Sequence, residues 1–232
     1  MKITNAMILA AGFGKRMHPL TLKTPKPLLL LHKKNLLERS IELLIENGIN
    51  KIVINIHYLA DQIKTFIEKK NYNIKIVISD EQKLLLDTGG GVYQGTKIFK
   101  NNPFLVINPD TLWNKGYSAE LKKVEKLYFK EKKSCLLLVN KKLIFDNSFK
   151  GDFNLKDNIV SRDSNNQYVF TGLQILDETV FNQTKEKVFS MNKIWDELIR
   201  DKKLLGIQSN QKFYHLNTKE MFDKISNLKI ID

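Results

Sequence analysis

Hydrophobic residues follow two alternating patterns over the first 140 positions of the chain. Short, continuous apolar runs are typical of strands buried in a parallel sheet, and they predict strands at 6–10, 49–56, 74–78, 104–107 and 134–140. Apolar residues at helical spacing, or segments that favour helix, predict helices between them at 36–47, 60–70, 92–99 and 119–133. This alternation predicts an α/β protein with helices on both faces of a mostly parallel sheet.

After residue 140 the pattern changes, because residues that favour turns become frequent. They cluster at 146–148, 156–158 and 163–166, and the short segments between these clusters predict a small hairpin-rich lobe. Further along, the sequence predicts a helix at 191–202, a hairpin around Ser209 and Asn210, and a C-terminal helix at 219–228. No linker or repeat divides the chain, so we expect a single domain over residues 1–232.

Composition is that of a soluble globular protein. Of the 232 residues, 42% are hydrophobic and 27% are charged, which allows a core without disulfides. The only cysteine, Cys135, lies in an apolar run, so we expect a buried structural thiol and no internal disulfide. The N-terminal apolar run is too short for a secretion signal, and no apolar stretch reaches membrane-spanning length. We therefore expect a cytoplasmic protein with no membrane partner.

The formal net charge of +13 raises the possibility of a nucleic-acid partner. Only four of the 38 basic residues are arginine, and the lysines are scattered. Proteins that read nucleic acids usually concentrate arginine and aromatic residues on one face. We interpret the charge as a solvated lysine surface that attracts phosphorylated substrates, with no nucleic-acid partner. Nucleic-acid binding, the alternative, predicts an affinity that falls steeply with salt.

Residues 9–27, LAAGFGKRMHPLTLKTPKP, carry the strongest chemical signal in the chain. Small residues after a predicted strand let the backbone approach a polyphosphate and direct N–H groups toward it. These small residues are Ala10, Ala11, Gly12 and Gly14. Lys15 and Arg16 add cations, and two prolines hold Lys26 on a stiff stretch, where its ammonium is suited to neutralising charge between two phosphate groups.

Common nucleotide-binding motifs do not fit this loop. The dinucleotide fingerprint requires glycine at position 17, where Met17 stands, and the P-loop requires serine or threonine after Lys15, where Arg16 stands. The 19-residue string instead resembles the N-terminal signature of the sugar-1-phosphate nucleotidyltransferases, Leu-Ala-Ala-Gly-x-Gly-x-Arg-Met-x-Pro-Leu-Thr followed by Pro-Lys-Pro. The resemblance implies the nucleotide-diphospho-sugar transferase fold, a Rossmann-like three-layer sandwich with a mostly parallel mixed sheet and a small sugar-binding lobe.

The same resemblance implies roles for this loop, which in the family wraps the nucleoside triphosphate. The nucleotide-binding residues that it implies are Ala10, Ala11, Gly12, Gly14 and Lys15. It implies that Arg16 contacts the leaving pyrophosphate and that Lys26 lies near the α-phosphate and the sugar phosphate, so both are expected to be catalytic. It also implies that residues 1–140 form a nucleotide-binding half and residues 141–232 a sugar-binding half.

Two further segments resemble the N-acetylmuramate-1-phosphate uridylyltransferase branch of the family: 55–59 (NIHYL) and 86–91 (LDTGGG). In that branch the glycine-rich turn lies against the base, which implies that Gly89 and Gly90 bind the nucleotide. Glycines allow the backbone a close, flat approach to a base edge. Considered alone, three consecutive glycines favour a flexible turn before a helix.

Residues 108–110 (NPD) follow a predicted strand, at the end of an α/β strand where ligands bind. They resemble the family's Asn-Gly-Asp, which implies that Asn108 binds nucleotide and that Asp110 binds Mg²⁺, with Mn²⁺ as an alternative. Magnesium typically takes one or two carboxylates and completes its shell with phosphates and water. Without the resemblance, Asp110 could equally cap the next segment.

The second half adds candidate sugar contacts. Residues 151–153 (GDF) resemble an element that contacts the phosphosugar, which implies a substrate-binding role for Asp152. Residues 170–176 resemble the family's sugar-binding strand, which implies that Thr171 and Gly172 line the sugar pocket. An aspartate in an exposed hairpin is also a common turn residue, so the structural alternative for Asp152 stays open.

Near the C-terminus the sequence departs from the family. Residues 213–219 (FYHLNTK) stand where relatives commonly carry Trp-x-Asp-Val-Gly-Thr-Pro, so His215 replaces the aspartate that is a second metal ligand. Neutral imidazole is a poor ligand for a hard cation such as Mg²⁺. Either His215 takes part in metal binding, directly with a shifted metal preference or through water, or Asp110 and the phosphates suffice. A buried structural histidine is an equally good interpretation.

The sequence thus predicts an enzyme that joins a nucleoside monophosphate from an NTP to a sugar-1-phosphate and releases pyrophosphate. UTP with N-acetylmuramate-1-phosphate is the first choice, mannose-1-phosphate guanylyl transfer is the alternative, and cytidylyl transfer to a small phosphorylated alcohol is less favoured. A non-catalytic nucleotide-sugar sensor is the alternative from another class, which the departure at His215 keeps open. No β-helix follows the domain, so we expect a monomer or a small homo-oligomer.

Overall fold

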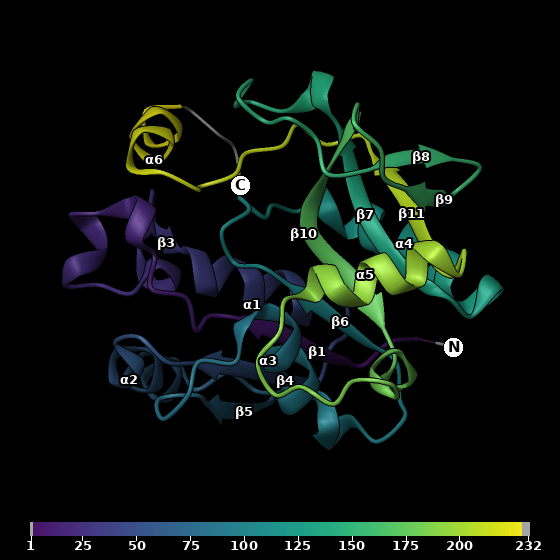
Figure 1. Cartoon of the computed structure of the whole chain (residues 1–232). Helices are drawn as coiled ribbons and strands as arrows, with labels where there is room; N and C mark the ends of the chain where they lie inside the picture. Colours follow the sequence, from purple (N-terminus) through teal and green to yellow (C-terminus); the bar gives the residue numbers. More distant parts are fainter. Residues whose placement is uncertain (1, 229–232) are drawn as a thin grey trace.

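The computed structural model describes residues 2–228 and is built around one mixed nine-stranded β-sheet (Figure 1). Across the sheet the strand order is β5-β4-β1-β6-β10-β7-β11-β9-β8. In chain order these are β1 (Asn5–Leu9), β4 (Lys51–Ile56), β5 (Lys75–Asp80), β6 (Phe104–Ile107), β7 (Ser134–Asn140), β8 (Asn154–Lys156), β9 (Ile159–Ser161), β10 (Tyr168–Leu176) and β11 (Leu204–Ser209). A separate two-stranded ribbon pairs β2 (Leu30–Leu31) with β3 (Lys34–Asn35).

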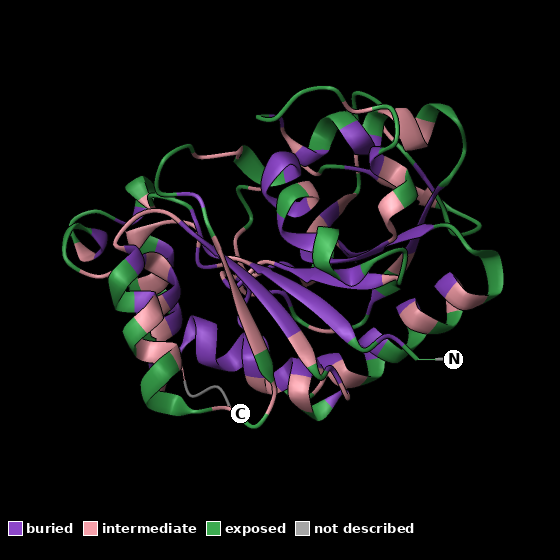
Figure 2. Ribbon diagram, turned by 90° about the horizontal axis from the view of Figure 1, so that it is seen from below, coloured by how far each residue is buried: buried purple, intermediate pink, exposed green. Residues whose placement is uncertain are grey.

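Helices cover both faces of the sheet, so the molecule has three layers (Figure 2). One face carries α1 (Leu36–Glu46), α2 (Ala60–Lys70) and α4 (Tyr117–Glu131), and the other carries α3 (Asp87–Thr96) and α5 (Met191–Arg200). A smaller cluster holds α6 (Lys219–Ser226) against the start of α1 and the β2 strand. This architecture confirms the predicted three-layer α/β sandwich. No helix within residues 2–228 is long and apolar enough to span a bilayer.

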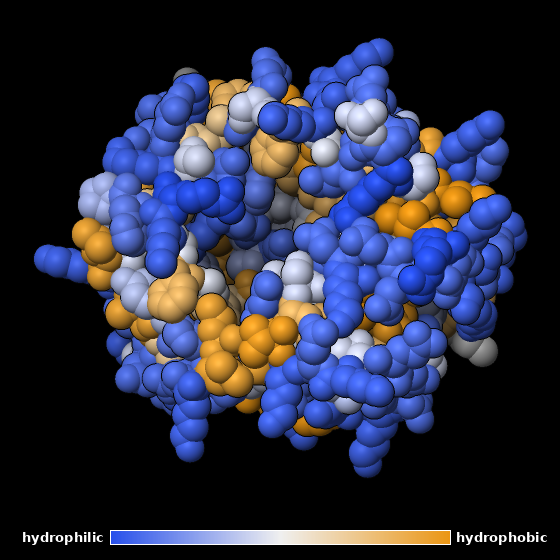
Figure 3. Space-filling model, in the orientation of Figure 1, coloured by the Kyte–Doolittle hydropathy of each residue, from blue (hydrophilic) through white to orange (hydrophobic). Residues whose placement is uncertain are grey.

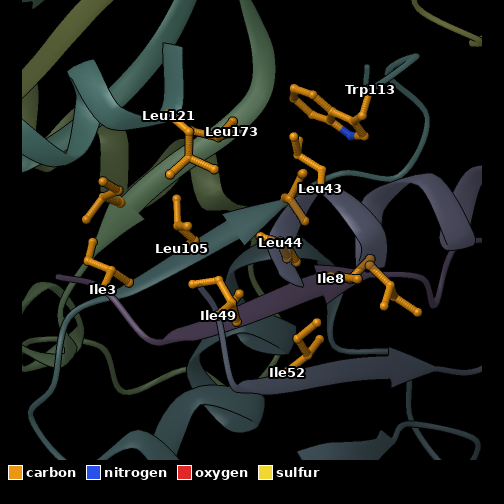
Figure 4. Close-up of a cluster of buried hydrophobic side chains, with 14 of the residues drawn as sticks. Ile3, Ile8, Leu43, Leu44, Ile49, Ile52, Leu105, Trp113, Leu121 and Leu173 are labelled. Carbon is orange, nitrogen blue, oxygen red and sulfur yellow. The ribbon is translucent and has the colours of Figure 1, made fainter. Parts of the chain in front are cut away.

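Alternation along the central strands divides the core in two. In β1, Ile8 belongs to the cluster beneath α1 and α4, whereas Met7 belongs to the cluster beneath α3 and α5. In the neighbouring strand β4, Ile52 belongs to the first of these clusters and Val53 to the second, because successive side chains of a strand point to opposite faces. Figure 4 shows Ile8 of β1 near Leu44 of α1, and Leu121 of α4 near Leu173 of β10. Strands buried on both faces explain the continuous apolar runs in the sequence.

The first half of the sheet is parallel throughout: β4 pairs with β5 and β1, and β1 pairs with β6. The carboxyl ends of these strands therefore meet at one edge of the sheet. The second half of the chain adds β10, which is antiparallel to both β6 and β7, and a parallel pairing between β7 and β11. Since β10 lies between β6 and β7, both halves of the chain contribute to one continuous sheet.

The predicted hairpin-rich lobe contains the β8–β9 hairpin, whose turn is at Asp157 and Asn158. Both turn residues have positive φ, 51° and 62°, as a tight hairpin requires. The hairpin predicted around Ser209 is wrong. After β11 the chain pairs instead with distant segments, through Phe213 opposite Ile144 and through His215 opposite Thr111. These long-range bridges place the His215 segment beside the loop after β6.

The cysteine prediction is confirmed, because Cys135 is fully buried in β7. Burial raises the pKa of its thiol to about 12, since a thiolate would lose its hydration there. The side chain therefore contributes to the core as a small apolar group.

Candidate active site

A pocket of about 400 Å³ opens at the carboxyl edge of β1 and β6. Its position corresponds to the hollow near the centre of the face in Figure 3. Four stretches of chain supply most of its wall: 9–12, 14–17, 26–27 and 108–110. Single residues from elsewhere complete the wall, namely Asn55, Glu81, Leu85, Asp87, Thr88 and Asn217. The pocket therefore joins residues 10–16, the predicted phosphate loop, to Lys26 and Asp110 in one cavity.

The phosphate loop leaves β1 at Leu9 and is held by side chains from other elements. Ala10 N–H donates to Asn55 Oδ1 over 2.8 Å, and the Gly14 carbonyl accepts from Thr21 Oγ1 over 2.8 Å. Gly14 has a φ of +65°, and a Cβ there would lie 3.0 Å from Thr21 and 3.1 Å from Lys26. Both the backbone conformation and the packing therefore disfavour a side chain at position 14.

Lys26, Asp110 and His215 form a charged cluster at the pocket. Lys26 Nζ lies 2.6 Å from Asp110 Oδ2, and His215 Nε2 lies 3.3 Å from the same oxygen. Asp110 is fixed through its backbone as well, because its carbonyl accepts from Leu216 N–H over 2.8 Å. Burial alone would raise the pKa of the Asp110 carboxyl, but Lys26 and then His215 outweigh burial and hold that pKa well below its usual range. The group is a carboxylate at neutral pH.

The donor set at Asp110 fits a divalent cation bound together with phosphates. Asp110 Oδ1 is buried and accepts a hydrogen bond from no described residue. A buried polar atom without a partner indicates a missing water or ion. Within residues 2–228, no group of three His, Cys, Asp or Glu side chains could hold a metal ion by itself. An ion at Asp110 would therefore take most of its ligands from phosphate oxygens and water.

The predicted glycines Gly89 and Gly90 are outside the pocket wall and belong to the first turns of α3. Their N–H groups donate to the Phe189 carbonyl over 2.9 and 3.0 Å. A Cβ on Gly89 would lie 2.4 Å from the Phe189 ring, and one on Gly90 would lie 2.2 Å from the Lys187 carbonyl oxygen. The glycines thus allow α3 to pack against the segment before α5, and the preceding residues Asp87 and Thr88 line the pocket. The helix begins at Asp87, earlier than predicted.

Four predicted residues of the second half also lie outside the wall that the described residues form: Asp152, Thr171, Gly172 and His215. Asp152 Oδ2 accepts from Phe170 N–H over 2.9 Å, and Thr171 Oγ1 donates to the Leu137 carbonyl over 2.8 Å. The Gly172 carbonyl accepts from Asn108 N–H over 2.8 Å. Gly172 and His215 thus contact the wall residues Asn108 and Asp110, whereas Asp152 and Thr171 bond to residues outside the wall.

Sequence reasoning missed a buried pair that joins the phosphate loop to the loop after β5. Glu81 is 3% exposed; its Oε1 accepts from Asn55 Nδ2 over 2.8 Å and its Oε2 accepts from Leu86 N–H over 3.0 Å. Asn55 in turn holds Ala10. Asn55 lies inside an apolar run and Glu81 follows another after two polar residues, so no local pattern pairs them.

Replacing Glu81 with glutamine is expected to loosen both loops. An amide has only one acceptor oxygen, so either Asn55 Nδ2 or Leu86 N–H would face an NH₂ group and lose its partner. The expected cost is about 1–3 kcal/mol of unfolding free energy. Urea unfolding measures the cost, and faster hydrogen exchange at Leu86 would locate it. Glu68→Gln, the same substitution at an exposed position of α2, serves as the matched control. An equal loss of unfolding free energy in this control would contradict the role given to Glu81.

The fold and the pocket together define an α/β protein with a polar pocket at the carboxyl ends of its parallel strands. The sequence model of the family described as "Nucleotidyl transferase" matches residues 5–142, more than half of the chain. The chain belongs to the nucleotidyl transferase family and is an enzyme of that class.

Similar proteins bear out the resemblance to sugar-1-phosphate nucleotidyltransferases. N-acetylmuramate alpha-1-phosphate uridylyltransferase of Caulobacter vibrioides is 29% identical over 219 residues, which cover 91% of this chain and 90% of the relative. The protein of that name from Neisseria meningitidis is 41% identical over 115 residues, covering 49% of this chain and 50% of the relative. Mannose-1-phosphate guanylyltransferase catalytic subunit beta of Xenopus tropicalis is 32% identical over 110 residues, covering 46% and 31%.

Solved structures show the same fold. HddC from Yersinia pseudotuberculosis, in a complex with GMP-PN, superposes with a TM-score of 0.77 at 23% identity and covers 97% of this chain and 98% of its own. The inositol-1-phosphate CTP transferase from T. maritima superposes with a TM-score of 0.78 at 15% identity and covers 100% and 99%. These matches confirm the predicted nucleotide-diphospho-sugar transferase fold.

Proposed function

We propose that this enzyme condenses UTP with N-acetylmuramate-1-phosphate, giving the UDP-sugar and pyrophosphate. The observation that carries the proposal is the single pocket shared by the phosphate loop, Lys26 and the ionised Asp110. The choice of substrates is supported by the uridylyltransferase from Caulobacter vibrioides, which aligns over 90% of its own length. Mannose-1-phosphate guanylyl transfer is the second candidate, supported by a relative that aligns over less than a third of its length.

The reaction is an in-line substitution at the α-phosphorus. An oxygen of the sugar-1-phosphate forms a bond to that phosphorus, and the bond to the bridging oxygen of the β-phosphate breaks, so pyrophosphate leaves with the electron pair. The nucleophile is already an anion, so no general base is required, and catalysis consists of positioning and charge neutralisation. We assign the loop amides with Lys15 and Arg16 to the β- and γ-phosphates, and Lys26 to the α-phosphate.

We assign the divalent ion, Mg²⁺ or Mn²⁺, to Asp110. When bound, the ion supplies positive charge to phosphate oxygens. The Asp110 carboxylate would hold it through Oδ1, while Oδ2 faces Lys26 and His215. His215 then orients the carboxylate and is not itself directed at the pocket. An imidazole in that supporting place agrees with the weak affinity of imidazole for hard cations.

We further propose that residues 1–140 bind the nucleotide and that 141–232 supply the sugar side, in a cytoplasmic enzyme that acts on small molecules as a monomer or small homo-oligomer. Sugar contacts by Asp152, Thr171 and Gly172 remain predictions, since none of the three lines the pocket and each bonds to another part of the protein. So do base contacts by Gly89 and Gly90, whose N–H groups bond to Phe189.

Replacing Gly12 with alanine is expected to separate binding from stability. A Cβ at Gly12 would meet no atom within 4 Å, and its φ lies outside the left-handed region, so the fold accommodates the methyl group. The methyl group would enter the space assigned to the triphosphate and weaken NTP binding by about tenfold or more. Calorimetric titration with UTP and a melting curve together test this. A stable variant with unchanged affinity would contradict the assignment of the loop.

The proposed function is tested by a thermal-shift panel of UTP, GTP, CTP and dTTP with Mg²⁺, followed by pyrophosphate release against candidate sugar phosphates. Stabilisation by UTP and turnover with N-acetylmuramate-1-phosphate are expected. Stabilisation by GTP alone, with turnover of mannose-1-phosphate, would select the second candidate. NTP binding without turnover under every metal and sugar would indicate a nucleotide-sugar sensor instead.

A further inference from the structure

Two buried oxygen atoms at the pocket lack a partner among the described residues: Asp110 Oδ1 and Asn217 Oδ1. Both residues line the pocket, whereas His215, two positions before Asn217, does not. Leaving a buried polar atom unpaired is costly, so two such atoms in one wall require an explanation. Oxygen atoms of a carboxylate and a carboxamide can share one kind of partner, a hard cation.

Backbone pairing brings Asn217 to Asp110 although the two are far apart in sequence. Leu216 N–H donates to the Asp110 carbonyl over 2.8 Å, and Thr111 pairs with His215 in an antiparallel bridge. On the far side, Thr218 caps α6 by accepting from Met221 N–H. The position of Asn217 is thus fixed from both directions along the chain.

The orientation of the Asn217 amide agrees with a cation as its partner. Its Oδ1 is buried without a partner among the described residues, and the residue lines the pocket. Asp146 lies near the same side chain, and a carboxylate only accepts hydrogen bonds, so the NH₂ group suits Asp146 and the carbonyl oxygen suits a cation.

We propose that Asn217 Oδ1 is a ligand of the divalent ion that Asp110 Oδ1 holds, an inference that rests on the proposed function. The motif that the sequence resembles has a glycine at this position and an aspartate where this chain has His215. Here His215 contacts the other oxygen of Asp110. The second protein oxygen is then that of Asn217, two residues further along the chain, and it is neutral.

A neutral second ligand has a consequence for the order of binding. With one carboxylate beside Lys26, the protein alone attracts a cation weakly. The negative charge that a triphosphate brings would complete the site, so the ion should bind well only together with phosphate.

The test measures Mn²⁺ binding to the full chain by water-proton relaxation. Inorganic tripolyphosphate replaces the NTP in these measurements, so the result does not depend on base or sugar. Asn217→Leu removes the oxygen at nearly constant volume and is expected to weaken Mn²⁺ binding by about tenfold or more. Tripolyphosphate binding in EDTA, measured by calorimetry, should not change. Asp110→Asn is the reference variant and should lose most of the binding.

A second variant gives a readout that a structural role of Asn217 would not produce. Asn217→Cys places a soft thiolate at the site, so the concentration of Cd²⁺ needed to displace half of the bound Mn²⁺ should fall by about tenfold or more relative to the parent. The native Cys135 is buried and does not compete for Cd²⁺.

Parent-like Mn²⁺ affinity in Asn217→Leu, with binding lost in Asp110→Asn, would overturn the inference and leave the proposed function standing. An unchanged Cd²⁺ preference in Asn217→Cys would also overturn it. Parent-like binding in Asp110→Asn would instead remove the metal assignment on which the inference depends.

Discussion

Lys26→Met is expected to lower kcat for nucleotidyl transfer by about 10²- to 10³-fold, the usual effect of removing one preorganised charge from a transition state. The lysine stands between Pro25 and Pro27, and its Cβ packs within about 3 Å of the position where Gly14 would carry a side chain. Its ammonium is therefore held at the pocket before substrate binds. KM for the NTP should change less than kcat, because the other loop donors still bind the β- and γ-phosphates.

The control for this variant is Lys23→Met, which removes an exposed lysine three positions away. Lys26→Met also leaves Asp110 without its closest cation, so the unfolding free energy should fall by about 1–3 kcal/mol. Assays well below the melting temperature separate the two effects. Steady-state kinetics on both variants measure the result. A kcat of Lys26→Met within threefold of the parent would show that Lys26 does not stabilise the transition state.

The parts of the structure that could be predicted are those set by local sequence. The helix at Ala60–Lys70 and the strands at Phe104–Ile107 and Ser134–Asn140 have the predicted bounds, because apolar periodicity and turn residues determine them. The loop at 10–16 follows a buried strand, as predicted, and most of its residues line the pocket, while its contact with phosphate stays a prediction.

The parts that could not be predicted depend on contacts between distant segments. Three glycines in a row indicate a turn, yet here they lie in the first turns of α3, where the segment at 187–189 packs against Gly89 and Gly90 and accepts hydrogen bonds from their N–H groups. Asn217 lies at the pocket because a β-bridge joins His215 to Thr111, two residues that are more than 100 positions apart in the sequence. No pattern within a local window encodes either contact.

The charged cluster illustrates the limit of a resemblance. The motif that the sequence resembles has a metal-binding aspartate where this chain has His215, and the sequence left three roles for the histidine open. The structure places the ring of His215 against Phe213 at 5.7 Å and its Nε2 beside Asp110 Oδ2. Under the proposed assignment this pairing makes His215 a residue that orients the ligand Asp110, and such a pairing depends on tertiary contacts.

Asp110→Asn is expected to have the largest effect of all, a loss of about 10³-fold or more in kcat/KM with Mg²⁺. The carboxylate is the one anionic group of the cluster, and it is kept ionised by Lys26 and His215 even though it is buried. An asparagine keeps the shape but lacks the charge that holds a divalent ion, and it leaves Lys26 without its counterion. The loss in ion affinity and the loss of preorganised charge should combine.

Metal titrations distinguish this mechanism from general damage. In Asp110→Asn the Mg²⁺ concentration for half-maximal activity should rise by at least tenfold, and excess Mn²⁺ should restore part of the rate, because Mn²⁺ binds oxygen and nitrogen ligands more readily than Mg²⁺ does. Asp201→Asn, at an exposed position after α5, should behave like the parent. If Asp110→Asn lost activity with an unchanged metal requirement, the carboxylate would be a structural partner of Lys26, and the ion would have to bind elsewhere on the triphosphate.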